Sequence, residues 1–188
     1  MMAELQLVQL FTIMIITNPN DVIDKILNQK AVALFQKNSE WGPRALGHRS
    51  ILFDPRNNDA QLIVNMIKKR EWWRPFAGTI LLDHVNDWFE MHTLKESPYM
   101  SFAIDAKDVA KEKISSIIHD DTCRIQTVTR EQNKVFYDLI KLFYDRTGVP
   151  ILLNTSLNLA GEPLAETLDE VKSIVERSEL NYIYYVED

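Results

Sequence analysis

The sequence predicts an α/β fold in which a single twisted mixed sheet is flanked by helices. Two observations predict it: short apolar runs typical of buried strands, and intervening segments whose apolar residues recur at helical spacing. With 188 residues, 46% of them hydrophobic, the chain is long enough to bury a sizeable core as one domain. We expect residues 1–17 to hold an apolar lead-in and the first strand, and residues 18–188 to form the domain itself.

The first half of the chain predicts strands interleaved with two helices. Asn18 is expected to cap the first helix, with Pro19 at its first position. Glycines and a proline interrupt the segment 39–50, which we expect to be a structured loop. Asn58 or Asp59 is expected to cap the next helix. The strands are expected at 11–16, 31–35, 51–53 and 78–82.

The second half alternates in the same way. Thr129 and Gln132 match a capping box at the start of a long helix, and Gly148 matches its end. Thr167 opens a second capping box. Residues 106–121 are polar, and we expect them to form a surface loop. The remaining elements are a short helix at 85–89, a loop at 155–163 and strands at 99–104, 123–128, 150–154 and 182–186.

Charge and cysteine content narrow the class of protein. A net charge of −6 argues against general nucleic-acid binding, which needs a basic face. The single cysteine, Cys123, excludes an intramolecular disulfide and a cysteine-cluster zinc site, and fits a reducing, cytoplasmic location. The apolar residues 1–16 lack the basic start and cleavage site of a signal peptide and are too short to span a membrane.

Positive charge is concentrated in the segment 65–76. Four cations lie there beside two tryptophans: Lys68, Lys69, Arg70 and Arg74. In an acidic chain this concentration predicts an anion pocket, because Arg and Lys bind phosphate and carboxylate groups. The alternative is an ordinary helix end, where cations suit the helix dipole. Trp72 or Trp73 is suited to stacking on a base, although we expect at least one of them to lie in the core.

Three polar loops and one strand residue carry the other candidate groups: Arg44–Arg49, Lys68–Arg74, Asn154–Asn158 and Arg124. Ser156 and Asn158 follow an apolar strand and offer donors to an anion or a ribose. The backbone N–H groups of 154–156 are suited to an anion nest. Several cations without an evident nucleophile–base pair favour nucleotide or phosphate chemistry, in which catalysis is mainly positioning and charge stabilisation.

Each of these residues also has a structural alternative. Arg44 and Arg49 are placed to pair with Glu40 and Asp54 and so hold their loop, and Asn154 or Ser156 is able to shape a turn. The four histidines are scattered, and no Walker A, dinucleotide-binding or His-x-x-x-His pattern is present. We therefore assign no metal to protein ligands and expect only the Mg²⁺ that a nucleotide carries.

Five motifs in order give the chain a specific family resemblance, which runs from about residue 31 to 186. The sequence resembles the C-terminal domain of the NodU/CmcH-type O-carbamoyltransferases, a domain with a YrdC-like fold. The motifs lie at Glu40–Ile51, Asp54–Arg56, Asn65–Ala77, Thr122–Val128 and Thr147–Asn158, followed by Gly161–Pro163.

The resemblance implies a reaction. This domain of the family takes ATP and carbamoyl phosphate and makes carbamoyl adenylate. A separate N-terminal subunit, of the actin-like ATPase type, then passes the carbamoyl group to a small-molecule hydroxyl acceptor. By motif position, the catalytic residues are Lys68, Arg74, Arg124 and Ser156. The substrate- and nucleotide-binding residues are Arg44, Arg70, Asn154 and Asn158.

The chain departs from the family pattern at two places. Lys37-Asn38 stands where the family has Gly-Arg, and Asp120-Asp121-Thr122 stands where it has Asp-Gly-Thr, which adds an acid near Arg124. The missing transfer domain leaves two alternatives open. One is a nucleotide- or RNA-binding YrdC-like module without turnover, and the other is a degenerate fragment of a longer carbamoyltransferase.

Overall fold

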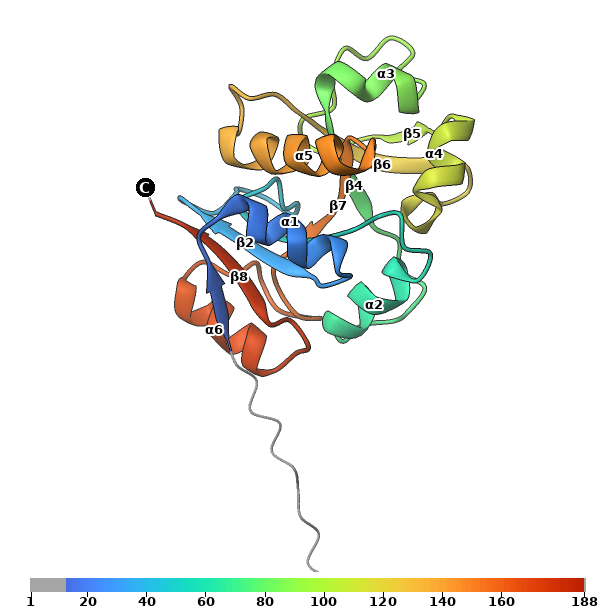
Figure 1. Ribbon diagram of the computed structural model, residues 1–188. Helices are drawn as coiled ribbons and strands as arrows, with labels where there is room; N and C mark the ends of the chain where they lie inside the picture. The colour runs from blue at the N-terminus through green and yellow to red at the C-terminus, as the bar shows by residue number, and fades with distance from the viewer. Residues whose placement is uncertain (1–12, 188) are drawn as a thin grey trace, which may run out of the picture.

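One mixed sheet of eight strands runs through residues 13–187, the part of the chain that this computed structural model describes (Figure 1). Its spatial order is β1-β8-β2-β3-β7-β4-β6-β5. The strands are β1 (Met14–Ile16), β2 (Val32–Gln36), β3 (Arg49–Phe53), β4 (Ala77–Leu81), β5 (Ala103–Asp105), β6 (Thr122–Val128), β7 (Ile151–Ser156) and β8 (Tyr182–Val186).

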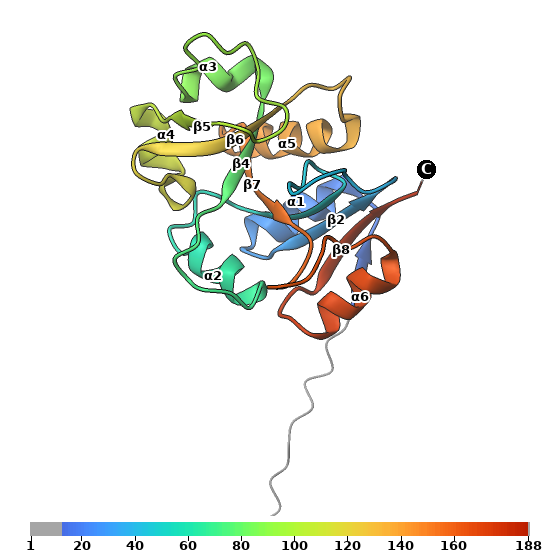
Figure 2. The ribbon, with the colours of Figure 1, turned by 180° about the vertical axis from the view of Figure 1, so that it is seen from behind.

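Six α-helices and two 3₁₀ turns connect the described strands. They are α1 (Pro19–Leu27), α2 (Ala60–Ile67), η1 (Leu82–His84), α3 (Val85–Trp88), α4 (Asp108–Lys113), η2 (Ser115–Ile117), α5 (Lys134–Thr147) and α6 (Leu168–Glu176). Helices α1 and α5 pack against each other, and α5 also contacts β4 and β7. Figures 1 and 2 show α3 and α6 at opposite ends of the molecule, with α5 between them and α6 beside β8. The predicted fold class, a mixed sheet flanked by helices, is confirmed.

The sheet is mixed because it contains three parallel and four antiparallel strand pairs. Strand β8 runs parallel to β1 and β2, and β4 runs parallel to β6, whereas β7 lies antiparallel between β3 and β4. Strands β2 and β3 are buried along their whole length. Strand β7 lies inside the sheet between β3 and β4. It pairs with β4 as far as Asn154, and its last two residues pair with β3 alone.

Local sequence signals account for several helix ends. The side chain of Asn18 accepts a hydrogen bond from Asn20 N at 2.9 Å, with Pro19 opening α1. Thr167 and Glu170 form the predicted capping box of α6. Gly148 ends α5 in the left-handed conformation, at φ +71°.

Two helix starts differ from the prediction. Helix α5 begins at Lys134, where the side chain of Asn133 caps Phe136 N at 3.1 Å. Thr129 and Gln132 do exchange the hydrogen bonds of a capping box, but these bonds close a turn that precedes the helix. Asp59 occupies the N-cap position of α2 without a capping side-chain bond.

The polar segment 106–121 is not the surface loop that we predicted, because it contains α4 and η2. Ala110, Ile114 and Ile117 are buried there at helical spacing. Charged residues lie between these three apolar positions, so the helical pattern is hard to recognise in the sequence. The predicted strand at 99–104 is also wrong for most of its length, since only β5 pairs, and Met100 has a positive φ of +53°.

Predicted loop boundaries also moved. Strand β7 continues through Ser156, which pairs with Ser50 of β3, so the loop predicted at 155–163 begins later. Arg49 and Ser50 belong to β3 rather than to the loop at 39–50. The expected first strand is observed as β1, and residues 1–12 lie outside the described part of the chain. No helix within residues 13–187 is both long and apolar enough to cross a bilayer.

Candidate functional site

The register of three central strands sets the floor of the site. Asn154 of β7 lies opposite Ala77 of β4, and Gly78 of β4 lies opposite Ile125 of β6. Arg124 and Asn154 therefore flank Ala77 in one row across the sheet, and side chains in such a row share one face. Ser156 lies two residues after Asn154 and belongs to the same face.

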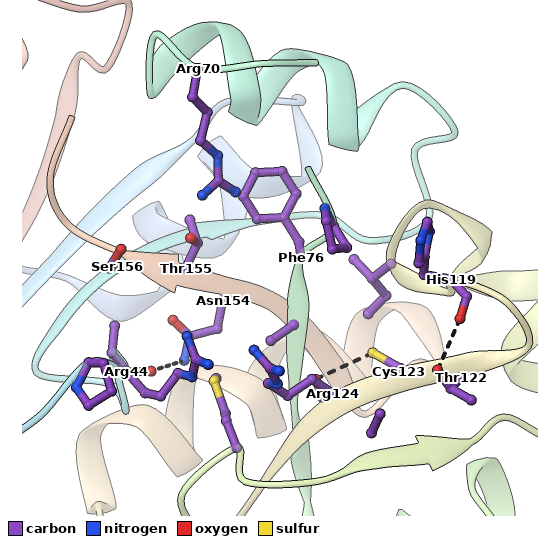
Figure 3. Close-up of a pocket in the computed structure, with 17 residues that line it drawn as sticks. Arg44, Arg70, Phe76, His119, Thr122, Cys123, Arg124, Asn154, Thr155 and Ser156 are labelled. Carbon is purple, nitrogen blue, oxygen red and sulfur yellow. Dashed lines mark hydrogen bonds between the residues drawn. The ribbon is translucent and has the colours of Figure 1, made fainter. Parts of the chain in front are cut away.

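A cavity of about 320 Å³ opens above this row (Figure 3). Such a volume is at the small end of the range for small-molecule sites, about 300–1,000 Å³. It brings together five of the eight predicted site residues: Arg44, Arg70, Arg124, Asn154 and Ser156. Lys68, Arg74 and Asn158 do not line it.

The cavity is electropositive. Three arginines line it, and none of the lining residues is Asp or Glu. No ion pair among the described residues includes any of these arginines. Burial, with the nearby charge of Arg124 adding to it, lowers the pKa of Arg44. Like charges held together in this way favour a polyanionic ligand, since each guanidinium then gains a counter-charge.

Arg70 enters the cavity from the end of α2. Its Nε donates to Asn65 Oδ1 at 2.5 Å, and its guanidinium lies 4.6 Å from the centre of the Phe76 ring. Burial, and then the charge of Arg74, lowers the pKa of Arg70 to about 10, while Glu71 opposes this shift. Figure 3 shows Arg70 and Phe76 on one side of the cavity and Arg44 with Arg124 on the other.

Glu40 shapes the loop that delivers Arg44. Its carboxylate accepts hydrogen bonds from the backbone N–H groups of Leu46, His48 and Arg49, at 2.7, 2.6 and 3.1 Å. The Glu40 carboxylate therefore binds backbone N–H groups of the loop and forms no ion pair with Arg44. The structural alternative of an Arg44–Glu40 pair is wrong.

Arg49 supports the same loop from inside. It is 2% exposed, and its guanidinium donates to the carbonyl oxygens of Gln36, Lys37 and Glu166 at 2.8, 2.8 and 3.1 Å. Asp54, its expected alternative partner, binds Arg56 instead at 2.6 Å. Arg49 therefore stabilises its loop, as the structural alternative proposed. Its hydrogen-bond partners are backbone carbonyl oxygens and not the expected carboxylate.

Lys68 lies under the site rather than in it. The side chain is 2% exposed, and Nζ donates to Ser156 O at 2.5 Å, Asn158 O at 2.9 Å and Asn158 Oδ1 at 2.8 Å. Ser156 Oγ lies 3.3 Å from the same nitrogen. Burial, assisted by the charge of Arg70, lowers the pKa of Lys68 to about 7. Lys68 therefore fastens the end of α2 to the turn that follows β7.

Arg74 and the two tryptophans lie at the surface. Arg74 pairs with Glu71 at 2.7 Å, and about half of its side chain is exposed. Trp72 is 67% and Trp73 56% exposed, so the expectation that at least one of them lies in the core is wrong. Two residues of the preceding helix α2, Leu62 and Met66, are also exposed, at 46% and 56%. These four side chains give the α2 region an apolar surface.

Asn158 contributes to the turn and not to the cavity. Its Oδ1 accepts from Ser156 Oγ at 2.7 Å and from Lys68, while its Nδ2 donates to Glu162 O at 2.7 Å. Asn158 and Lys68 therefore bind the hydroxyl of Ser156, while Ser156 itself lines the cavity.

Asn154 has one amide atom fully bonded and one without a partner. Its Nδ2 donates to Ala45 O at 3.1 Å, Thr79 Oγ1 at 3.0 Å and Gln126 Oε1 at 3.3 Å. Its Oδ1 is buried and has no hydrogen-bond donor among the described residues. An unsatisfied buried acceptor costs about 1–3 kcal/mol, so the fold retains here a group that a ligand is able to satisfy.

Several residues of the cavity were missed by sequence reasoning. Phe76, Met100, His119 and Cys123 line it but come from separate segments. Burial raises the pKa of the Cys123 thiol to about 12, which makes it a poor nucleophile. Met100 and His119 lie in segments predicted as strand and loop, whereas Met100 has a positive φ of +53° and is buried. No local signal marks these residues in the sequence.

No group of three or more His, Cys, Asp or Glu side chains within residues 13–187 is arranged to hold a metal ion. The cavity lining instead offers guanidinium, hydroxyl and amide groups. Such donors suit phosphate and carboxylate oxygens, whereas Mg²⁺ requires oxygen ligands.

Comparison with known proteins identifies relatives of the chain. A nodulation protein NolNO from Sinorhizobium fredii is 40% identical over 146 residues, which cover 76% of this chain and 22% of that protein. Nodulation protein U from Rhizobium tropici is 36% identical over 137 residues, which cover 72% of this chain and 24% of that protein. The chain thus spans about a quarter of the length of these curated relatives.

Solved structures share the fold at much lower identity. Full-length HypF, in its phosphate- and nucleotide-bound form, superposes with a TM-score of 0.66 at 15% identity, covering 92% of this chain and 25% of HypF. Sua5 from P. abyssi superposes with a TM-score of 0.62 at 12% sequence identity, and the match covers 92% of this chain and 48% of Sua5. These likenesses show a YrdC-like fold.

The model of the family described as "Carbamoyltransferase C-terminus" matches residues 23–187, which include every cavity-lining residue. This match, together with the nodulation relatives, shows that the chain belongs to the carbamoyltransferase C-terminal domain family.

Proposed function

We propose that this domain binds MgATP and carbamoyl phosphate and forms carbamoyl adenylate, the activated carbamoyl donor. The observation that carries the proposal is the cavity in which Arg44, Arg70 and Arg124 converge without an acidic neighbour. Two phosphorylated substrates bring more negative charge than one cation neutralises, and a lining of three guanidinium groups matches that demand. Membership of a carbamoyltransferase family supports the carbamoyl group as the one transferred.

The reaction balances with one water. Carbamoyl phosphate, ATP and water give carbamoyl adenylate, pyrophosphate and phosphate. Water attacks the phosphorus of carbamoyl phosphate and the bond between this phosphorus and the carbamoyl oxygen breaks, which releases phosphate and leaves carbamate. A carbamate oxygen then attacks the α-phosphorus of ATP, the bond from the α-phosphorus to the bridging oxygen of the β-phosphate breaks, and pyrophosphate leaves with the electron pair. The arginines would hold the phosphoryl oxygens and stabilise the charge that develops on them. Mg²⁺ would enter on the nucleotide, because the lining offers it no carboxylate.

Lys68 and Asn158 would act as positioning residues in this reaction, since they hold Ser156 from below the cavity. This differs from the role that the family resemblance implies for Lys68. Arg74, paired with Glu71 at the surface, would become a ligand only if it left that pair.

The test is release of pyrophosphate and phosphate by the full chain with MgATP and carbamoyl phosphate, compared with reactions lacking either substrate. Arg124→Ala is expected to lower kcat/KM about 10- to 100-fold, the effect of one lost charge-assisted hydrogen bond. Arg130→Ala is the matched control, because Arg130 pairs with Asp138 at the surface. Equal activity of the two variants, or product release without carbamoyl phosphate, would contradict the proposal.

A nucleotide-binding module without turnover is the second candidate. HypF, which shares this fold, has been solved in a phosphate- and nucleotide-bound form, and this favours nucleotide binding by the fold. Calorimetric binding of MgATP that depends on Arg124, without pyrophosphate release in the presence or absence of a transfer subunit, would support this candidate. Tight binding of single-stranded RNA instead would point to the nucleic-acid alternative.

We also propose that an N-terminal carbamoyl-transfer subunit docks on the apolar surface of the α2 region and passes the carbamoyl group to a hydroxyl acceptor. Leu62, Met66, Trp72 and Trp73 are exposed there, next to the cavity residues Arg70 and Pro75. Alignments of 146 and 137 residues cover 22% and 24% of two curated relatives, so these proteins are about 3 to 3.5 times as long as this chain, and their additional region is large enough to dock on this face.

Exposed tryptophans beside a site are suited to an interface, because they bury large apolar area on association. The Trp72→Ser/Trp73→Ser double variant is expected to weaken binding of the purified N-terminal subunit at least tenfold while pyrophosphate release by the domain alone is retained. Trp41→Ser is the control, since Trp41 is fully exposed on another loop. Equal affinity for all three chains would exclude this surface.

A further inference from the structure

The cavity contains one acceptor that points to substrate selection. Asn154 is 1% exposed, lines the cavity, and has an Oδ1 atom without a donor among the described residues. The lining contains three arginines, all of them donors, and no Asp or Glu. An acceptor in such surroundings does not serve phosphate binding, because phosphate oxygens are acceptors as well.

The orientation of the Asn154 amide is determined by its neighbours. The hydroxyl of Thr79 donates to Gln126 Oε1 at 2.9 Å, and Gln126 Nε2 donates to Leu46 O at 3.0 Å. Thr79 Oγ1, Gln126 Oε1 and Ala45 O are therefore all acceptors toward Asn154, and all three surround its Nδ2. If the Asn154 amide were rotated by 180°, Oδ1 would lie against two other acceptors, Ala45 O and Gln126 Oε1. The network therefore fixes Nδ2 toward these acceptors and leaves Oδ1 on the opposite side, without a partner.

We infer that Asn154 Oδ1 accepts a hydrogen bond from the NH₂ group of the carbamoyl substrate and thereby selects carbamoyl phosphate over acyl phosphates that carry a methyl group. This inference rests on the proposed function, which brings carbamoyl phosphate to the cavity. The NH₂ group is the only N–H donor of carbamoyl phosphate, and its phosphate is directly linked to the carbamoyl carbon.

The position of Asn154 favours this nitrogen. Figure 3 shows its side chain between those of Arg44 and Arg124, and the strand register places it in one row with Arg124. A phosphate held by these arginines would leave the attached carbamoyl group beside the amide. Acetyl phosphate has the same shape but carries a methyl group, which would leave Oδ1 unsatisfied. Sites built to bond an N–H or O–H group reject analogues that lack it by up to about 10⁴-fold.

The test compares the dissociation constants of carbamoyl phosphate and acetyl phosphate by calorimetry on the full chain. The wild-type chain is expected to prefer carbamoyl phosphate at least 100-fold, and Asn154→Ala is expected to reduce that preference to less than tenfold. Asn154→Asp retains an acceptor at this position and should keep the preference while binding both anions more weakly. Thr79→Val removes a partner of Nδ2 but keeps Oδ1, and it should also keep the preference.

Two results would overturn the inference: equal affinity of the wild-type chain for both phosphates, including no binding of either, or a full preference in a folded Asn154→Ala chain. Thermal melts establish folding, and Asn154→Ser replaces Asn154→Ala if the latter does not fold. Adenine also carries an amino group, so the ratio is measured twice more, once in the presence of ATP and once in the presence of inosine triphosphate. A preference that depends on the adenine amino group would overturn the assignment to carbamoyl. Absent pyrophosphate release with a retained preference would contradict only the proposed reaction.

Discussion

Replacing Lys68 by methionine tests whether this lysine stabilises the fold as a buried hydrogen-bond donor or is accessible to bind substrate. Nζ is bonded to two backbone carbonyl oxygens, those of Ser156 at 2.5 Å and Asn158 at 2.9 Å. Methionine fills similar space but donates nothing, so both carbonyls lose their buried donor. Each unsatisfied group costs about 1–3 kcal/mol, and we expect Lys68→Met to lower the free energy of unfolding by about 2–5 kcal/mol at pH 9.

The effect depends on pH with a defined sign. Burial lowers the pKa of Lys68 to about 7 in the folded chain, compared with about 10.4 in an unfolded chain. Between these values the unfolded chain binds more protons, so the contribution of Lys68 to stability rises with pH. The stability difference between wild type and Lys68→Met should therefore grow from pH 7 to 10, by less than about 1.4 kcal/mol per pH unit, the limit for one proton.

The assay is urea unfolding of both chains at pH 7, 8 and 9, followed by tryptophan fluorescence. Lys69→Met is the matched control, because the neighbouring lysine is exposed and its substitution should change stability by less than about 0.5 kcal/mol. A Lys68→Met chain as stable as Lys69→Met, or a stability difference that falls between pH 7 and 9, would refute the view of Lys68 as a buried fastening.

Three further predictions concern the support of the site. Gly47→Ala should destabilise the chain by at least about 2 kcal/mol in urea unfolding, because Gly47 has φ +101° and an added Cβ would lie 2.2 Å from Phe136; unchanged stability would contradict this packing. Thr167→Ala should cost about 1 kcal/mol by the same measurement, through loss of the capping box, whereas Thr167→Ser should cost little. Cys123 should resist alkylation by iodoacetamide at pH 8 in the native chain and react in urea, because burial raises its pKa to about 12; rapid native labelling would show an open cavity floor.

Elements with a local cause were predicted correctly. The helix starts at Asn18 and Thr167 and the helix end at Gly148 depend on side chains or φ angles within a few residues, and these interactions need no partner from elsewhere in the fold. Central strands such as β2 are continuous apolar runs, which burial on both faces requires.

Elements that depend on distant packing were predicted poorly. The helix α4 and turn η2 bury only Ala110, Ile114 and Ile117 among many charged residues, so composition suggested a loop. Trp72 and Trp73 are exposed, and the sequence around them does not reveal this, since large aromatic residues are equally suited to a core or to an interface.

The sequence by itself determined the fold class, the family and a set of eight candidate site residues, because periodicity, caps and motif spacing are properties of neighbouring residues. It did not divide that set into residues that line the cavity and residues that hold it. Arg44, Arg70 and Arg124 face the cavity, whereas Lys68 and Arg49 are buried beneath backbone carbonyls. Only the tertiary structure decides this division, because an arginine or lysine donates equally well to a phosphate or to a carbonyl, and strand register selects which of them it meets.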